Sequence, residues 1–101
     1  MNNHQFDLVR STYPAADAQE VLLSLINDKI KFLNCKIFSL QERFGEAPVH
    51  LRERAEELKS KKREVAETLN ACGEDCMIEI DCQIAFSIKE GKTQEAQYDA
   101  V

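Results

Sequence analysis

The chain has 101 residues, 44% of them hydrophobic and 31% charged, which is typical of a single folded domain and excludes an intrinsically disordered chain. Its net charge is −5, and residues 73–101 alone carry seven acidic and two basic side chains. Because an acidic segment repels nucleic acid phosphates and anionic lipids, the sequence predicts neither nucleic acid nor a membrane as a partner.

A short strand is expected first, over about residues 4–10, because Phe6 and Leu8 alternate with polar residues. A helix start is then indicated by Ser11-Thr12-Tyr13-Pro14. A hydroxyl side chain can accept a hydrogen bond from a free backbone N–H group at that end, and the fixed φ of proline suits the first turn.

A long helix is predicted next, over about residues 13–44. Its apolar residues recur at alternating spacings of three and four, which is typical of a coiled-coil seam. These seam residues are Leu23, Ile26, Ile30, Leu33, Ile37, Leu40 and Phe44. Gly45 follows and is expected to end the helix in the left-handed conformation. Val21, Leu25 and Phe32 lie beside the seam, so the apolar arc is wider than one neighbouring helix can cover.

A second helix is predicted over about residues 48–72, between Pro48, which suits a first turn, and Gly73, which stops it. The same spacing recurs at Leu51, Ala55, Leu58, Lys62, Val65, Leu69 and Cys72. Lys62 is the exception in this seam, and we expect its methylene groups to lie along the seam with the ammonium in water. Because the turn between the helices is short, they should form an antiparallel, coiled-coil-like hairpin.

A long strand with one apolar face is predicted over about residues 76–89. That face consists of Ile78, Ile80, Cys82, Ile84, Phe86 and Ile88. A lone strand cannot satisfy its backbone, and the only candidate neighbour is the segment 4–10. The predicted fold is therefore α+β in the order β-α-α-β. It forms a single domain over residues 1–91, followed by a flexible polar tail at 92–101.

Homodimerisation is expected to complete this fold. Two helices and two short strands cannot cover the wide apolar arc, and both edges of a two-stranded sheet stay open. A twofold-related copy would close one of those edges. The predicted partners are therefore a second copy of the chain and another protein.

Three cysteines define the alternative function, a thiol-based metal or redox sensor. Cys72, Cys76 and Cys82 could supply three thiolates, but their spacing matches no tight zinc pattern and their surroundings are acidic. Cys72 continues a helix seam, while Cys76 and Cys82 share the parity of the apolar strand face, which favours buried thiols without chemistry. We therefore predict no metal and no cofactor.

No catalytic motif is recognisable, so the chain is predicted not to be an enzyme. Glu79 and Asp81 lie on one strand face, but no glycine-rich loop or polar pocket accompanies them, which favours a solvated face. The basic cluster at residues 59–63 is flanked by glutamates, and Glu57 and Lys61 have the favourable i,i+4 spacing. Without stacking aromatics nearby, this cluster does not favour nucleic acid binding.

The preferred interpretation is a small non-enzymatic protein–protein interaction module, such as an adaptor, regulator or inhibitor, that acts as a homodimer. The candidate contact residues are Phe38, Phe44, Val49 and Leu51 around the hairpin turn, and Glu79, Asp81 and Gln83 on the long strand. The first residues lack the basic and apolar regions of a signal peptide, and no apolar run is long enough to cross a bilayer. A cytoplasmic protein is therefore expected.

Overall fold

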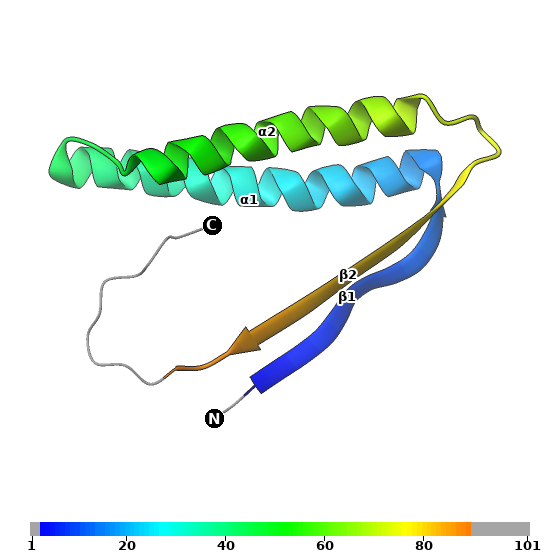
Figure 1. Ribbon diagram of the computed structural model, residues 1–101, viewed down its shortest axis with the longest axis horizontal. Helices are drawn as coiled ribbons and strands as arrows, with labels where there is room; N and C mark the ends of the chain where they lie inside the picture. Colours follow the sequence, from blue (N-terminus) through cyan, green and yellow to red (C-terminus); the bar gives the residue numbers. More distant parts are fainter. Residues whose placement is uncertain (1–2, 90–101) are drawn as a thin grey trace.

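The computed structural model describes residues 3–89 and contains two strands and two helices. They follow in the order β1 (Asn3–Pro14), α1 (Ala15–Phe44), α2 (Val49–Asn70) and β2 (Met77–Ser87). The helices form an antiparallel hairpin, and the strands form a two-stranded antiparallel sheet (Figure 1). The predicted α+β class and β-α-α-β order are confirmed. The predicted tail at 92–101 and the domain end at 91 lie outside the described residues.

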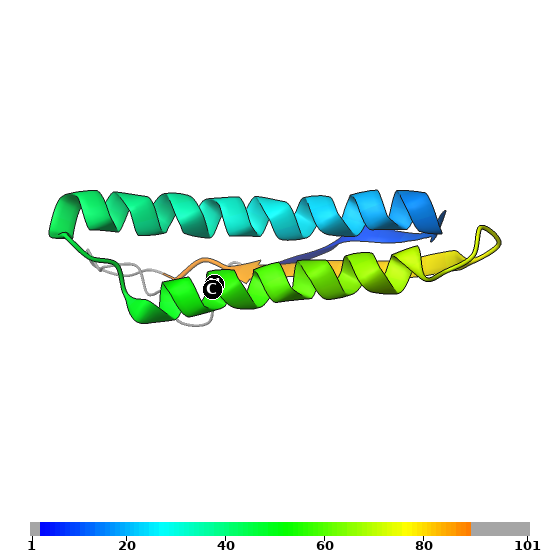
Figure 2. The same cartoon turned by 90° about the horizontal axis from the view of Figure 1, so that it is seen from above.

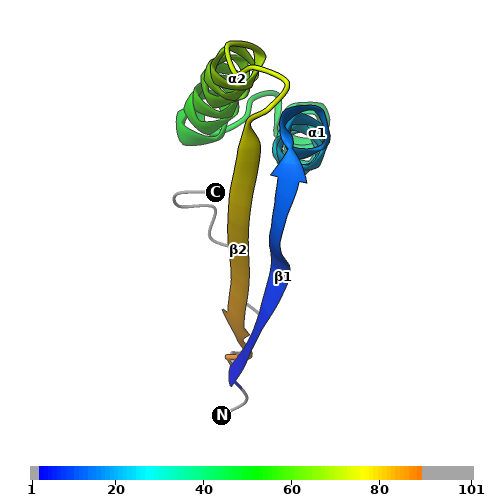
Figure 3. The same ribbon diagram turned by 90° about the vertical axis from the view of Figure 1, so that its right-hand side faces the viewer.

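The sheet and the hairpin join at one end and diverge toward the other, as the two arms of a V (Figure 1). The helices lie side by side above the sheet (Figure 2), with α1 over β1 and α2 over β2 (Figure 3). The molecule measures 51 × 35 × 15 Å, and its radius of gyration is 17.0 Å. A compact chain of about this length has a radius of gyration of roughly 13 Å. One copy is therefore elongated and open.

The start of α1 differs from the prediction. The segment Ser11-Thr12-Tyr13-Pro14 is the last part of β1, where its residues pair with β2, and the helix begins at Ala15. Pro14 occupies the N-cap position and no side chain caps the helix. The predicted hydroxyl cap is wrong because the sheet takes up this stretch of backbone. The helix end is confirmed: Gly45 is left-handed with φ 82°, and its N–H donates to the carbonyl of Gln41 at 2.8 Å.

The second helix is slightly shorter than the predicted range of 48–72. Pro48 is its N-cap and Val49 its first residue, while Asn70 is its last residue. Beyond the end, the N–H of Cys72 donates to the carbonyl of Leu69 at 3.1 Å, in the tight turn with which helices commonly finish. The helix thus ends ahead of Gly73, which does not have a positive φ.

The sheet contains a β-bulge that the sequence pattern did not reveal. Asp7 pairs with Gln83 and Val9 pairs with Cys82, so Leu8 is an extra residue without a partner. Residues on either side of the bulge keep the alternation, which puts Phe6 and Val9 on the same face as the apolar face of β2. Val9 therefore takes the position that the prediction gave to Leu8, and the strand continues beyond the predicted end at residue 10.

Two separate clusters of buried side chains hold the fold together. The tip core, near the helix–helix turn, consists of Leu33, Ile37, Ala47, Leu51 and Ala55, with Leu40 and Leu58 packed against it. The base core, where the arms of the V meet, consists of Ala18, Leu69 and Ile80, with Val9, Tyr13, Val21, Leu22, Val65 and Ile78 packed against it. The base core shows that the apolar face of the sheet is turned toward the hairpin.

Candidate interaction surfaces

The outer half of the sheet exposes large apolar side chains. Phe6 is 48% exposed, Phe86 is 49% exposed and Ile88 is 52% exposed, whereas Ile84 is partly buried. The register places Phe6 opposite Ile84, and Phe86 lies opposite His4, with the two rings stacked 5.0 Å apart. We call Phe6, Ile84 and Phe86, together with Ile88 just after the end of β2, the outer sheet face.

The divergence of the two arms explains why this face is not covered. Ile80 belongs to the base core, but the helices lie progressively farther from the strands beyond it (Figure 1). The strand pattern predicted one apolar face for β2 and did not indicate that only its first half meets the helices. Phe6, Phe86 and Ile88 were therefore missed as candidate contact residues. The sequence did contain one signal, the length of the apolar alternation in β2. That alternation is longer than the stretch of strand that the base of the helical hairpin can cover.

The helix–helix turn carries a second exposed apolar surface. Phe38, Phe44 and Val49 are exposed, the last two at 66% each, and we call these three residues the tip patch. A shallow groove runs along α1 between Asn27 and Phe38. Leu51, which was predicted to belong to this surface, has an exposed fraction of 0% and lies in the tip core. It supports the turn from inside and is not available for contact.

The acidic residues of β2 lie on the other face of the sheet. Glu79, Asp81 and Gln83 are exposed, as a solvated strand face requires. Arg10 pairs with Asp81 in the register, yet its guanidinium contacts Asp7 of its own strand at 3.4 Å. Neither Glu79 nor Asp81 forms an ion pair with another of the residues 3–89.

The three thiols of the alternative function are not brought to one place. Cys72 lies next to Cys76 in the segment before β2, whereas Cys82 lies in the sheet opposite Val9. Desolvation raises the pKa of the Cys72 thiol, and the neighbouring Cys76 raises it further. A raised pKa lowers the thiolate fraction, which is the reactive and metal-binding form. Within the described part of the chain, no three cysteine, histidine or acidic residues are placed to hold a metal ion.

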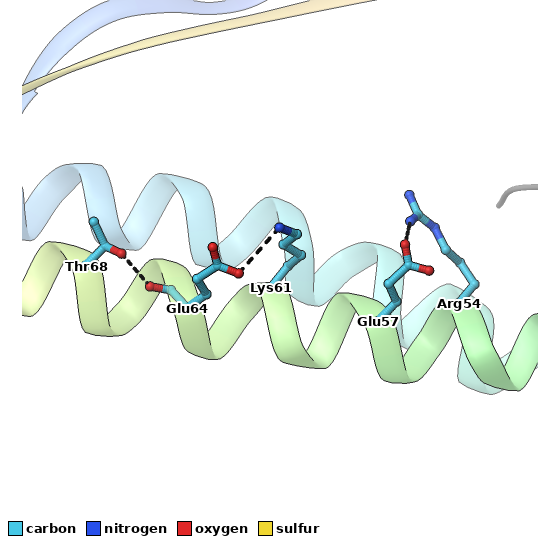
Figure 4. Close-up of polar contacts among 5 residues, drawn as sticks. All are labelled: Arg54, Glu57, Lys61, Glu64 and Thr68. Atoms are coloured by element: carbon cyan, nitrogen blue, oxygen red, sulfur yellow. Dashed lines mark hydrogen bonds and ion pairs between the residues drawn. The ribbon is translucent and has the colours of Figure 1, made fainter.

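Ion pairs on the surface of α2 engage two residues of its basic cluster, and Figure 4 shows the pair of Lys61 with Glu64. Lys59 contacts Glu56 at 3.3 Å and Lys61 contacts Glu64 at 3.4 Å. The predicted pair of Glu57 with Lys61 does not form, because Glu57 contacts Arg54 at 2.9 Å instead. All these pairs join residues three apart on exposed helix, where each contributes little to stability.

Comparisons with protein-family models, with curated proteins and with solved structures found no match. Among residues 3–89, no helix has the length and apolar content that crossing a membrane requires.

Proposed function

We propose that the chain is a small non-enzymatic protein–protein interaction module that acts as a homodimer and presents its helix–helix turn to a protein partner. The observation that carries this proposal is the outer sheet face, on which Phe6, Phe86 and Ile88 remain about half exposed in one copy. Apolar side chains gathered on one face of a strand pair are typical of an association surface.

A second copy is the preferred occupant because it offers the same apolar face and the same open strand edges. The chain cannot cover this face with its own hairpin without closing the V, and the base core fixes where the two arms join. Burial of apolar surface stabilises association by roughly 25 cal/mol per Å². Pairing in a closed twofold dimer would therefore bury the outer sheet face without leaving a new open end.

The tip patch supports the second half of the proposal, a contact with another protein. Phe44 is the last residue of α1, Val49 is the first residue of α2, and Phe38 lies within α1; the tip core, with the fully buried Leu33 and Leu51, packs the helices together near this turn. A rigid apolar surface loses little conformational entropy when it binds, which favours affinity. An adaptor, regulator or inhibitor would use the patch in this way.

Sedimentation velocity over a wide dilution range tests the homodimer. We expect the wild-type chain to sediment as a dimer that dissociates on dilution, and Phe86→Ser to weaken the dimer by at least about tenfold, because each of two rings would lose on the order of 1 kcal/mol of burial. Met77→Ser is the matched control, since Met77 is also exposed on β2 but belongs to the opposite face. A wild-type monomer at every concentration would contradict the proposal, as would equal effects of the two variants.

The tip patch is tested separately with the double variant Phe44→Ser and Val49→Ser. Both residues lie outside the two cores, so we expect the variant to fold and to dimerise as the wild type does. Affinity purification measures the effect. Proteins that co-purify with the wild-type chain in proportion to its amount should no longer co-purify with the variant. Retention of all of them would exclude the patch as the contact surface.

A further inference from the structure

We infer that the second copy docks on the outer edge of β2, in an antiparallel register in which Ile84 faces Ile84 of the partner. This inference rests on the proposed homodimer. It specifies which sheet edge pairs, in which register, and which residues select that edge and register. The result would be a four-stranded sheet in the order β1-β2-β2-β1, with the two copies related by a twofold axis through the centre of the sheet.

The two edges of the sheet differ in their suitability for pairing. The bulge at Leu8 interrupts β1, and the strand ends in Pro14, which has no N–H to donate. Bulges and prolines are the features by which natural sheets block edge pairing. By contrast, β2 runs from Met77 to Ser87 without bulge, proline or glycine. Its outer edge has no strand neighbour among the described residues, because the sheet contains only β1 and β2.

The charges on the polar face of β2 restrict the register. Two carboxylates, Glu79 and Asp81, stand near the start of the strand, and Lys89 follows its end; all three are exposed. In an antiparallel self-pairing, a register centred on Asp81 would place this carboxylate against its own copy. A register centred on Ile80 would place Glu79 against Asp81 of the partner. Like charges directly opposite are destabilising, so the registers centred on Ile80 and on Asp81 are disfavoured.

A register centred on Ile84 makes both faces complementary. With residues 88 and 89 continuing the strand past Ser87 in the dimer, it places Glu79 opposite Lys89 of the partner on the polar face, twice in the dimer. On the apolar face it places Ile80 opposite the partner's Ile88, and Cys82 opposite the partner's Phe86. Three of the four residues of the outer sheet face thereby obtain apolar cross-strand neighbours, which is the arrangement that stabilises sheets.

The neighbouring registers are less complementary. Centred on Gln83, the pairing would place Lys89 opposite Met77 of the partner and leave the carboxylates without a cation. Centred on Ala85, it would place Lys89 opposite Asp81, but Ile80 would then have no described residue opposite it. Among the registers compared, the one centred on Ile84 sets Glu79 against a cation and keeps apolar residues opposite each other.

A charge-swap experiment tests the edge and the register, with the dimer dissociation constant as the readout. We expect Glu79→Lys and Lys89→Glu each to raise this constant by about tenfold or more, because each single variant creates two like-charge pairs. The double variant that carries both changes should restore it to within about threefold, since opposite charges again face each other. Glu74→Lys is the control for net charge, because Glu74 is exposed and precedes the strand.

The other outcomes separate this inference from the homodimer itself. If the wild-type chain dimerises but neither single variant weakens it more than Glu74→Lys does, the pairing edge is wrong while the homodimer stands. If Asp81→Lys combined with Lys89→Glu restores affinity and the Glu79 swap does not, the register is centred on Ala85 and the inference is overturned. A wild-type monomer overturns both. All the substituted residues lie outside the two cores, so circular dichroism should show the same fold throughout.

Discussion

At the scale of single residues, one backbone angle determines how the hairpin turns. Gly45 has φ 82°, a conformation in which a Cβ atom is strained, and a Cβ added there would meet no heavy atom within 4 Å. The strain of a substitution at this position therefore comes from the backbone alone. Gly73 also has open space around it but does not have a positive φ. The two glycines are a matched pair.

We expect Gly45→Ala to lower the free energy of unfolding by about 1 kcal/mol, because alanine must adopt the left-handed conformation. Gly73→Ala should leave it unchanged to within about 0.5 kcal/mol, or raise it by restricting the unfolded chain. Urea denaturation followed by circular dichroism at a fixed protein concentration measures both. Equal losses in the two variants would show that the turn does not depend on the left-handed residue.

The thiol of Cys72 gives a prediction that depends on pH. Its pKa is raised by desolvation first and by the nearby Cys76 second. At a given alkaline pH it should therefore be alkylated by iodoacetamide more slowly than a free thiol, and Cys76→Ser should speed its reaction by removing the second cause. Peptide mass spectrometry across a pH series resolves the cysteines. An unchanged rate in Cys76→Ser would exclude the influence of Cys76.

The raised pKa of Cys72 also determines whether this thiol stabilises the fold at low or at high pH. The folded chain holds the Cys72 proton more tightly than the unfolded chain does. The contribution of this group is therefore fully present below the ordinary thiol pKa and is lost as the pH rises through the raised value. Cys72→Ser should remove this alkaline loss, which urea denaturation of both proteins across an alkaline pH series measures.

At the scale of secondary-structure elements, the bulge in β1 decides which residue reaches the base core. Val9 is partly buried and packs against that core, whereas Leu8 is exposed and has no partner in the register. We expect Val9→Ala to lower the free energy of unfolding by about 1 kcal/mol and Leu8→Ala to change it by less than about 0.5 kcal/mol. Chemical denaturation of the two variants measures the difference. A larger loss for Leu8→Ala would place the extra residue elsewhere in the strand.

The elements with a strict period were predictable from sequence, and those without one were not. The three-four spacing located α1 and α2 to within a few residues, and the twofold alternation located β2. Ser11-Thr12-Tyr13-Pro14 satisfies the preferences of a helix start as well as those of a strand end, and only pairing with β2 decides between them. Likewise, Leu8 and Val9 are both apolar, so the sequence contains no local signal for the bulge between Asp7 and Val9.

The candidate surfaces were predictable to a smaller extent. Phe38, Phe44 and Val49 were chosen because they lie around the hairpin turn, and all three are exposed, whereas Leu51 near the same turn is buried by packing against the opposite helix. The outer sheet face depends on the angle between the sheet and the hairpin, which arises from tertiary packing at the base core. No periodicity in the sequence encodes that angle.

At the scale of the whole molecule, the open V means that different parts of the chain should respond differently to dilution. In an antiparallel strand, successive amide N–H groups point alternately to the two neighbouring strands. One set of β2 amides therefore bonds to β1 in a single copy, and the other set points to the outer edge. The outward set can be protected from hydrogen exchange only when a partner strand is present.

Hydrogen exchange measured by NMR at high and low protein concentration tests this directly. We expect alternate amides between Glu79 and Ser87 to lose protection on dilution, while the amides of α1 and α2 near the tip core keep theirs, because that core lies within one copy. The outward amides of β1 are the internal control and should exchange rapidly at both concentrations, since its bulge and Pro14 prevent pairing on that edge. Dilution-sensitive protection on β1 instead of β2 would reverse the assignment of the edge. Dilution-sensitive protection on neither strand would mean that the outer sheet face associates by packing alone, without extending the sheet.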